Sequence, residues 1–307
     1  MIKRVISYFI IFVIFAGGVP ADPGFAYTSQ DLKGKIIILD PGHGAESPNV
    51  WRDYYEHITM LDLAYKIKPL LEARGAEVRL TRATENDVPL PVRCAMINIW
   101  ALEVLRDEGR GNAVELDRLI RVMQRVVNDH ETYESIYFNT PYDLTHQREI
   151  HPDLRRIFEY QSDMLITERF LVISLHSNAT PRPVNTSRNG VDIYYMSNNI
   201  RSNRSYYTEY SNVRQNYYFG NLLIDEISSL GFRKQRVQPF HFFMLREHNL
   251  PAVLVENGFH TNDADRARLQ SDAFLSRLAA AYADTILLYF STFDTIVDPR
   301  IFDDVFG

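Results

Sequence analysis

The chain has 307 residues, of which 46% are hydrophobic and 23% are charged, a composition typical of a globular protein with a sizeable core. The formal net charge of −6 is mild, and no block of lysines and arginines occurs, so nucleic acid is excluded as an expected partner. Cys94 is the single cysteine, which excludes an internal disulfide and a lipid-attachment cysteine near the N-terminus.

The first residues have the pattern of an export signal. Lys3 and Arg4 precede an apolar run over 5–18, and small residues follow at 19–21 and 24–26. This pattern is typical of a secretory signal peptide. The run is shorter than the roughly 20 residues of a membrane-spanning helix, so a retained anchor is the alternative. We expect a signal peptide over 1–26, a polar linker over 27–34, and export to the periplasm or the outside of the cell.

From the linker onward, strand and helix patterns alternate along the chain. Apolar strand patterns and amphipathic helix patterns together occupy 35–292, and 293–307 form a C-terminal tail. The expected strands are 35–40, 76–81, 168–176, 190–197 and 251–256, and the expected helices are 55–73, 91–105, 216–231 and 272–290. This order predicts an α/β fold with a mostly parallel, twisted sheet and helices on both faces.

The stretch from about 102 to 166 is longer than a compact crossover between parallel strands requires, so we interpret it as a helical insertion. One part of it has apolar residues at helical spacing: Val114, Leu116, Leu119, Ile120, Val122, Met123, Val126 and Val127. Because the insertion precedes a central strand, we expect it beside one end of the crevice. It would be a lid, a wall of the substrate groove, or an embellishment packed elsewhere.

Three apolar strand patterns each end in a side chain that can bind a metal or carry a proton. These side chains are His43, His176 and Glu256, and Glu56 stands at the expected start of the first long helix. In an open α/β sheet the ligands gather beyond the carboxyl ends of the parallel strands. Two histidines and a glutamate form a ligand set suited to a catalytic zinc with an open position.

Each residue alone has a simpler interpretation. A lone histidine is more often a core or surface residue, and Glu56 could only complement the helix dipole. Glu256 could be a buried carboxylate paired with Arg246. The remaining histidines have no ligand spacing, and we interpret them as structural or solvated: His130, His146, His151, His241, His248 and His260.

The order of several motifs resembles one family. IIILDPGHG, EHITMLDLA, GAEVRLTR, LPVRCAMIN, VISLHSNA and PAVLVENGFHTNDAD follow one another along 35–101 and 168–290. In this order they resemble the zinc-dependent N-acetylmuramoyl-L-alanine amidases, in the type 3 catalytic domain. The resemblance implies one Zn²⁺ per chain, with His43, Glu56 and His176 as ligands and Glu256 as the catalytic glutamate.

Other positions match less well or have other roles. Arg82 and Arg93 fall on motif positions, and we expect them to be structural ion-pair partners. The sequence GAESPNVWRDYY after His43 replaces a glycine-rich run, and His57 replaces a common lysine. These departures affect the expected shape of the substrate groove more than the metal site.

The expected function is hydrolysis of the amide between N-acetylmuramic acid and the L-alanine of the peptidoglycan stem peptide, in cell-wall remodelling or daughter-cell separation. Asn178 and Arg246 are candidate substrate contacts, a monomer is expected, and the insertion could receive a protein activator. The alternatives are a zinc peptidase or carboxypeptidase acting on the stem peptide, and a non-catalytic cell-wall-binding module.

Overall fold

The computed structural model describes residues 31–139, 149–182, 184–198 and 210–292. The expected signal peptide, residues 27–30 of the expected linker, and the C-terminal tail lie outside the described residues. Within the described residues, Cys94 is buried as a free thiol.

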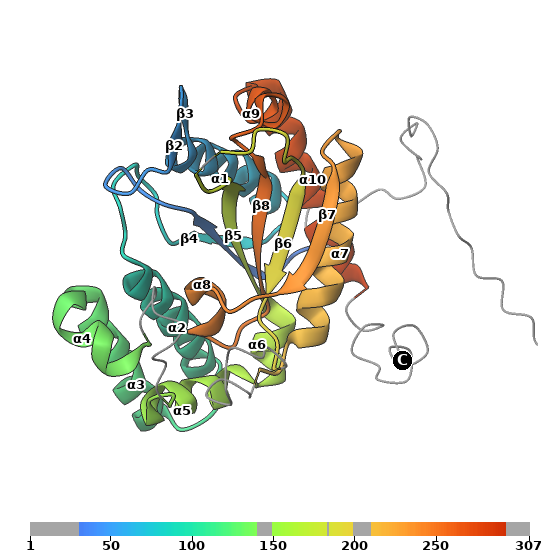
Figure 1. Cartoon of the computed structure of the whole chain (residues 1–307). Helices are drawn as coiled ribbons and strands as arrows, with labels where there is room; N and C mark the ends of the chain where they lie inside the picture. Colours follow the sequence, from blue (N-terminus) through green and yellow to red (C-terminus); the bar gives the residue numbers. More distant parts are fainter. Residues whose placement is uncertain (1–30, 140–148, 183, 199–209, 293–307) are drawn as a thin grey trace, which may run out of the picture.

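A six-stranded sheet forms the centre of the molecule (Figure 1). Its order is β4-β1-β5-β8-β6-β7, and every neighbouring pair is parallel except β6 and β8. The strands are β1 (Ile36–Pro41), β4 (Glu77–Leu80), β5 (Phe170–Asn178), β6 (Val191–Tyr195), β7 (Lys234–Pro239) and β8 (Ala252–Phe259). The predicted α/β class with a mostly parallel sheet is therefore confirmed.

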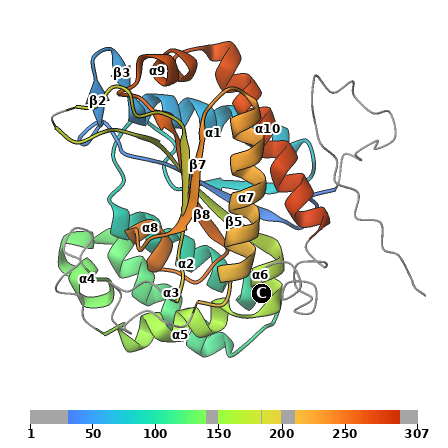
Figure 2. The same ribbon diagram turned by 45° about the vertical axis from the view of Figure 1, so that its right-hand side comes forward.

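Helices cover both faces of the sheet, as Figure 2 shows from the side. One face packs on α1 (Glu56–Glu72), α7 (Val213–Ser229) and α10 (Asp272–Ser291). The other face packs on α2 (Leu90–Asp107) and α8 (Phe243–Arg246). A small hairpin of β2 (Val50–Trp51) and β3 (Tyr54–Tyr55) precedes α1, and α9 (Asp263–Leu269) follows β8. Among the described helices only α10 is long and apolar enough to span a membrane, and it is largely buried here.

Strand alternation decides which side chains face α2. In β1 and β5 the odd-numbered Leu39 and Leu175 belong to the core beneath α1 and α10, whereas the even-numbered Ile38 and Val172 belong to the core beneath α2. Since side chains alternate between the two faces of a strand, the even-numbered His176 points toward the α2 face. His176 therefore lies near the carboxyl end of β5, on the face of the sheet that α2 covers.

The described residues of the expected insertion include four helices that follow α2. They are α3 (Ala113–Asn128), α4 (His130–Tyr137), α5 (Pro152–Gln161) and α6 (Met164–Arg169). Each begins at a residue whose side chain caps the first turn: Asn112, Asp129, His151 and Asp163. The amphipathic helix predicted in this stretch is confirmed as α3, which packs on α2. Its first apolar position is an exception, because Val114 is 78% exposed.

Candidate active site and metal centre

The turn after β1 brings His43 to the end of the sheet. His43 has a positive φ of 61°, a backbone conformation that non-glycine residues seldom adopt outside functional turns. The preceding Gly42 has no side chain, and a Cβ there would lie 2.3 Å from Cε1 of His176. Only glycine at position 42 therefore lets this turn pass so close to the second imidazole.

The structure brings the three predicted ligands together. Nε2 of His43 lies 3.4 Å from Oε2 of Glu56, and Nδ1 of His176 lies 3.0 Å from Oε1 of Glu56. One ligand atom from each residue falls within 4.8 Å of the others, and this is a group of a kind that could hold a metal ion. The two imidazole rings meet edge to face, with their centroids 5.1 Å apart.

The carboxylate of Glu56 is buried and held from two sides. Its Oε1 accepts a hydrogen bond of 2.8 Å from the backbone N–H of Ser177, and its Oε2 accepts one of 2.5 Å from the side-chain amide of Asn49. Burial raises the pKa of Glu56, and the charge of His43 opposes that shift. A bound cation would restore the ionised form that burial disfavours.

Both imidazoles suit a metal as well. Burial lowers the pKa of His43, and the charge of Glu56 opposes this shift only in part. Burial also lowers the pKa of His176, against the opposing charge of Glu256. Neutral imidazole is the form that binds a metal. Nδ1 of His43 lies 2.8 Å from the backbone carbonyl of Ser47, so its Nδ1–H is directed there and Nε2 is free for a ligand. The residues present therefore fit Zn²⁺.

Two buried arginines hold the turn that carries His43. Arg93 donates to the carbonyls of Pro41 and His43, at 2.8 and 2.6 Å, and forms an ion pair of 3.2 Å with Asp40. Arg82 donates to the carbonyls of Pro41 and Gly42. Both are therefore structural, as predicted, although Arg82 binds carbonyl oxygens in place of an ion-pair partner.

Asp40 is a buried carboxylate at the end of β1. Burial raises the pKa of Asp40, but the Arg93 charge and the hydroxyl groups of Ser174 and Thr81 outweigh it and hold the pKa below its usual value. Asp40 thus stays ionised and anchors Arg93 beneath the turn. This support of the site was not predicted from the sequence.

Glu256 lies on β8 directly opposite His176 of β5 in the sheet register. Its Oε2 is buried and has no hydrogen-bond partner among the described residues. Burial raises the pKa of Glu256 to about 8, while the charge of His176 lowers it. The alternative in which Glu256 pairs with Arg246 is wrong, because Arg246 forms its ion pair with Glu247 at 2.8 Å.

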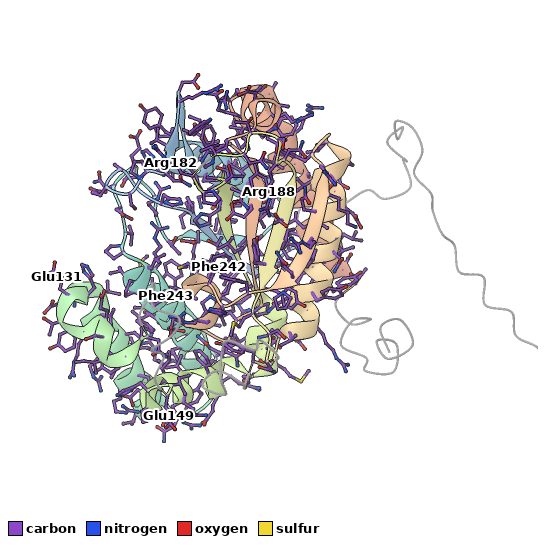
Figure 3. The ribbon with its side chains drawn as sticks, viewed as in Figure 1. Glu131, Glu149, Arg182, Arg188, Phe242 and Phe243 are labelled. Atoms are coloured by element: carbon purple, nitrogen blue, oxygen red, sulfur yellow. The ribbon has the colours of Figure 1, made fainter. Side chains whose placement is uncertain are left out.

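The two candidate substrate contacts differ in position. Asn178 lies two residues beyond His176 at the end of β5 and is half-buried. The side chain of Arg246 is fully buried against Glu247 and the ring of Phe243, which Figure 3 shows in the middle of the molecule. A substrate contact for Arg246 would need this buried pair to open, so the geometry gives it no support.

A cavity of ≈ 730 Å³ opens beside the candidate metal ligands. His43 and His176 line one part of it, and the apolar residues 88–91 line another. His130 and Glu134 of α4 line the part formed by the insertion. The insertion therefore lies beside the site. His130, which the sequence predicts to be structural or solvated, faces this cavity.

The sequence of most of the chain matches one family. Residues 37–105 and 143–287 match the pattern of the N-acetylmuramoyl-L-alanine amidase family. The chain belongs to this family. The unmatched residues 106–142 include α3 and α4, so the part of the insertion that reaches the cavity is additional to the family pattern.

Individual relatives agree with this membership. The chain is 26% identical to an N-acetylmuramoyl-L-alanine amidase AmiC of Neisseria meningitidis over 285 residues, 90% of this chain and 59% of that protein. It thus spans about three fifths of that relative. The fold is similar to that of an N-acetylmuramoyl-L-alanine amidase from Clostridium difficile, with a TM-score of 0.53 at 15% identity, covering 86% of this chain and 99% of that one. The fold is also similar to that of the CwlD amidase of Clostridioides difficile in complex with the GerS lipoprotein. The TM-score is 0.51 at 16% identity, and the match covers 84% of this chain and 99% of that one.

Several residues that support this amidase-family site were missed from the sequence. The backbone N–H of Ser177 binds Glu56. The side-chain Oγ of the same residue lies 2.8 Å from the hydroxyl of Tyr54 and 3.0 Å from Nδ1 of His260. His260 stacks on Tyr54. Asn49, which holds the other oxygen of Glu56, lies in a loop without any motif, so only the fold could reveal it.

Proposed function

We propose that the protein is a zinc-dependent amidase that hydrolyses the bond between N-acetylmuramic acid and the L-alanine of peptidoglycan stem peptides. The observation that carries this proposal is the placement of Glu256 directly opposite His176, beside an assembled ligand set. Such a set leaves room for water and substrate. Membership of the amidase family supports the choice of bond.

His43, Glu56 and His176 would hold about one Zn²⁺ per chain. When bound, the ion would polarise the substrate carbonyl and lower the pKa of water toward about 7. The chain's own contribution is a fixed ligand geometry, because Asn49 and Ser177 hold both oxygens of Glu56. Ligands held in this way need little reorganisation when the metal and substrate bind.

Glu256 would transfer the proton. Its carboxylate accepts a proton from the attacking water as the oxygen bonds to the carbonyl carbon, and it then donates this proton to the leaving nitrogen of L-alanine as the C–N bond breaks. A buried carboxyl with a raised pKa is suited to both steps near neutral pH. The products are the free lactyl carboxyl group and a peptide with an L-alanine amino terminus.

The insertion would form one wall of the substrate groove. His130 and Glu134 of α4 face the cavity that also contains His43 and His176. Figure 3 shows their neighbour Glu131 on the same helix. Within the insertion, Arg156 of α5 forms an ion pair of 2.9 Å with Glu115 of α3, and Tyr160 donates to that same carboxylate. The cavity-lining α4 packs against both α3 and α2. This favours a fixed wall over a mobile lid.

A short Gly/Ser linker in place of 113–137 would test this role on intact sacculi and a soluble muropeptide in parallel. A wall predicts a selective loss on sacculi. A lid predicts increased activity on both substrates, and unchanged rates on both would contradict either role.

The cellular setting is part of the same proposal. Relatives include proteins named probable cell wall amidases from Staphylococcus species, and the export pattern before residue 27 supports a location in the cell envelope. A monomer is proposed. A protein activator acting through the insertion is also proposed, with the lipoprotein complex of the CwlD amidase as its parallel.

Digestion of purified peptidoglycan followed by mass spectrometry tests the function. Stem peptides with a free L-alanine amino terminus are expected. A carboxypeptidase would release a C-terminal amino acid, and a binding module would leave the sacculi uncut.

A further inference from the structure

A row of three ionisable side chains crosses the sheet at its functional end. In the strand registers His176 of β5 is opposite Glu256 of β8, and Glu256 is opposite Asp192 of β6. Residues directly opposite one another on neighbouring strands point to the same face of a sheet. The Asp192 carboxylate therefore stands beside Glu256, on the side away from the metal ligands.

Asp192 is buried without a hydrogen bond. Its exposed fraction is 0%, and neither carboxylate oxygen has a hydrogen-bond partner among the described residues. The backbone N–H of Arg236, on the neighbouring β7, lies near enough to lower the pKa of Asp192 but does not meet hydrogen-bond geometry. Buried carboxylates in folded proteins are normally paired, so this arrangement requires a reason.

Two arginines supply positive charge around Asp192. Burial raises the pKa of Asp192, and the positive charges of Arg188 and Arg236 offset only part of that rise. Figure 3 shows Arg188 in the upper part of the molecule. For Glu256 the largest effect after burial is the charge of His176, which lowers the pKa, and the charges of Glu56 and then of Asp192 raise it.

Fold stability alone does not favour this pair. Whenever both carboxyl groups are ionised, they are like charges directly opposite each other on neighbouring strands, which is destabilising by roughly 0.2–1 kcal/mol. An asparagine at position 192 would keep the shape of the side chain and remove the repulsion. A costly arrangement at the edge of a catalytic site is a candidate for a functional role.

We propose that Asp192 is a positioning residue, whose negative charge on the β6 side holds the Glu256 carboxyl toward His176 and the substrate. The inference rests on the proposed function, because it explains how the proton-transferring group is oriented. Asp192 itself does not touch the substrate, since its oxygens are enclosed. Misplacement of a reacting group by about 1 Å can lower a rate on the order of a hundredfold.

The first test is Asp192→Asn in the full chain loaded with Zn²⁺, assayed on a soluble muropeptide. We expect kcat to fall between about tenfold and a hundredfold, with KM and zinc content unchanged. The melting temperature should stay the same or rise, whereas a purely structural role predicts that it falls. Asp192→Glu should restore part of kcat. Asp225→Asn is the charge-matched control. Asp225 lies on α7, where it is exposed and pairs with Lys234 of β7, so this variant should leave the kinetics unchanged.

The second test asks whether Asp192 acts through Glu256. In a Glu256→Gln background there is no carboxylate to repel, so adding Asp192→Asn should change the residual rate less than about twofold. Wild-type kinetics of the single variant, an equal loss in both backgrounds, or failure of Asp192→Asn to fold would each overturn the proposal. An inactive wild-type enzyme, in contrast, would be a failure of the proposed function itself.

Discussion

Nδ1 of His176 lies 3.0 Å from Oε1 of Glu56, although 120 residues separate them in the chain. β5 carries the first of these residues and α1 begins with the second, so the pair exists only because β1 and β5 are neighbours in the sheet. His43 follows β1 and completes the set. The ligand set is therefore a property of the sheet order, and each of its residues can be tested by its effect on metal binding.

Removal of the metal should abolish activity. Chelation of the purified enzyme should remove about one Zn²⁺ per chain, and added Zn²⁺ should restore the rate. His176→Ala should weaken zinc affinity strongly, because a site with two protein ligands holds zinc poorly. Metal analysis by mass spectrometry gives the stoichiometry. Full activity in a metal-free, chelator-treated preparation would contradict the assignment.

Glu256→Gln should separate chemistry from binding. The amide keeps the size of the side chain but cannot accept the proton of water, so the rate should fall on the order of 10²–10⁴-fold. Zinc content and melting temperature should remain close to those of the wild type. Near-normal turnover of this variant would remove Glu256 from the mechanism.

Arg93→Met should destabilise the fold and the site together. Asp40 would be left as a buried charge without its ion-pair partner, and such losses cost on the order of 3–5 kcal/mol. Denaturant unfolding measures the change. Arg118→Met is the matched control: its ion pair with Asp153 lies on the surface and is worth less than about 1 kcal/mol. Equal stability of the two variants would show that Arg93 does not hold the turn.

His248 should make stability depend on pH. It is fully buried, its Nε2 donates to the carbonyl of Met244, and its Nδ1 accepts from the N–H of Leu250. Burial lowers the pKa of His248 from 6.5 to about 4. The unfolded chain then binds more protons between these values, so stability is complete above pH 6.5 and falls as the pH drops toward 4. The slope is on the order of 1 kcal/mol per pH unit.

The control for this prediction is His248→Gln. The variant should be less stable at pH 7.5 because the two hydrogen bonds are altered, but its stability should change less between pH 6.5 and 4. Urea unfolding midpoints at pH 7.5, 6 and 5 measure both proteins. Parallel curves for the two proteins would show that His248 is not the titrating group.

The sequence predicted the central strands, because each apolar run is long and ends in a recognisable motif. β7 was not predicted, since KQRVQP has one strongly apolar residue and forms its strand only by pairing with β6 at the edge of the sheet. The antiparallel direction of β6 was also not predicted. Apolar patterning shows which residues are buried but not the direction in which a strand runs.

For the site, motif residues were easier to predict than the residues that support them. His43, Glu56 and His176 stand in motifs at strand and helix ends, and the structure brings them together. Asn49 holds Glu56 from a nearby loop that has no motif, and Asp192 is opposite Glu256 only because β6 and β8 pair, so neither could be identified from its local sequence. Arg246 was a candidate substrate contact from its sequence, and in the structure its side chain is buried in an ion pair with Glu247.

The most direct test of the central claim is hydrolysis of a soluble muramoyl peptide in ¹⁸O-labelled water by the zinc-loaded enzyme, with products identified by mass spectrometry. The proposed function predicts one ¹⁸O atom in the lactyl carboxyl group of N-acetylmuramic acid and an unlabelled peptide with a free L-alanine amine. Glu256→Gln should yield the same products far more slowly. Label in a carboxyl group within the stem peptide, or an intact substrate with zinc-loaded wild-type protein, would contradict it.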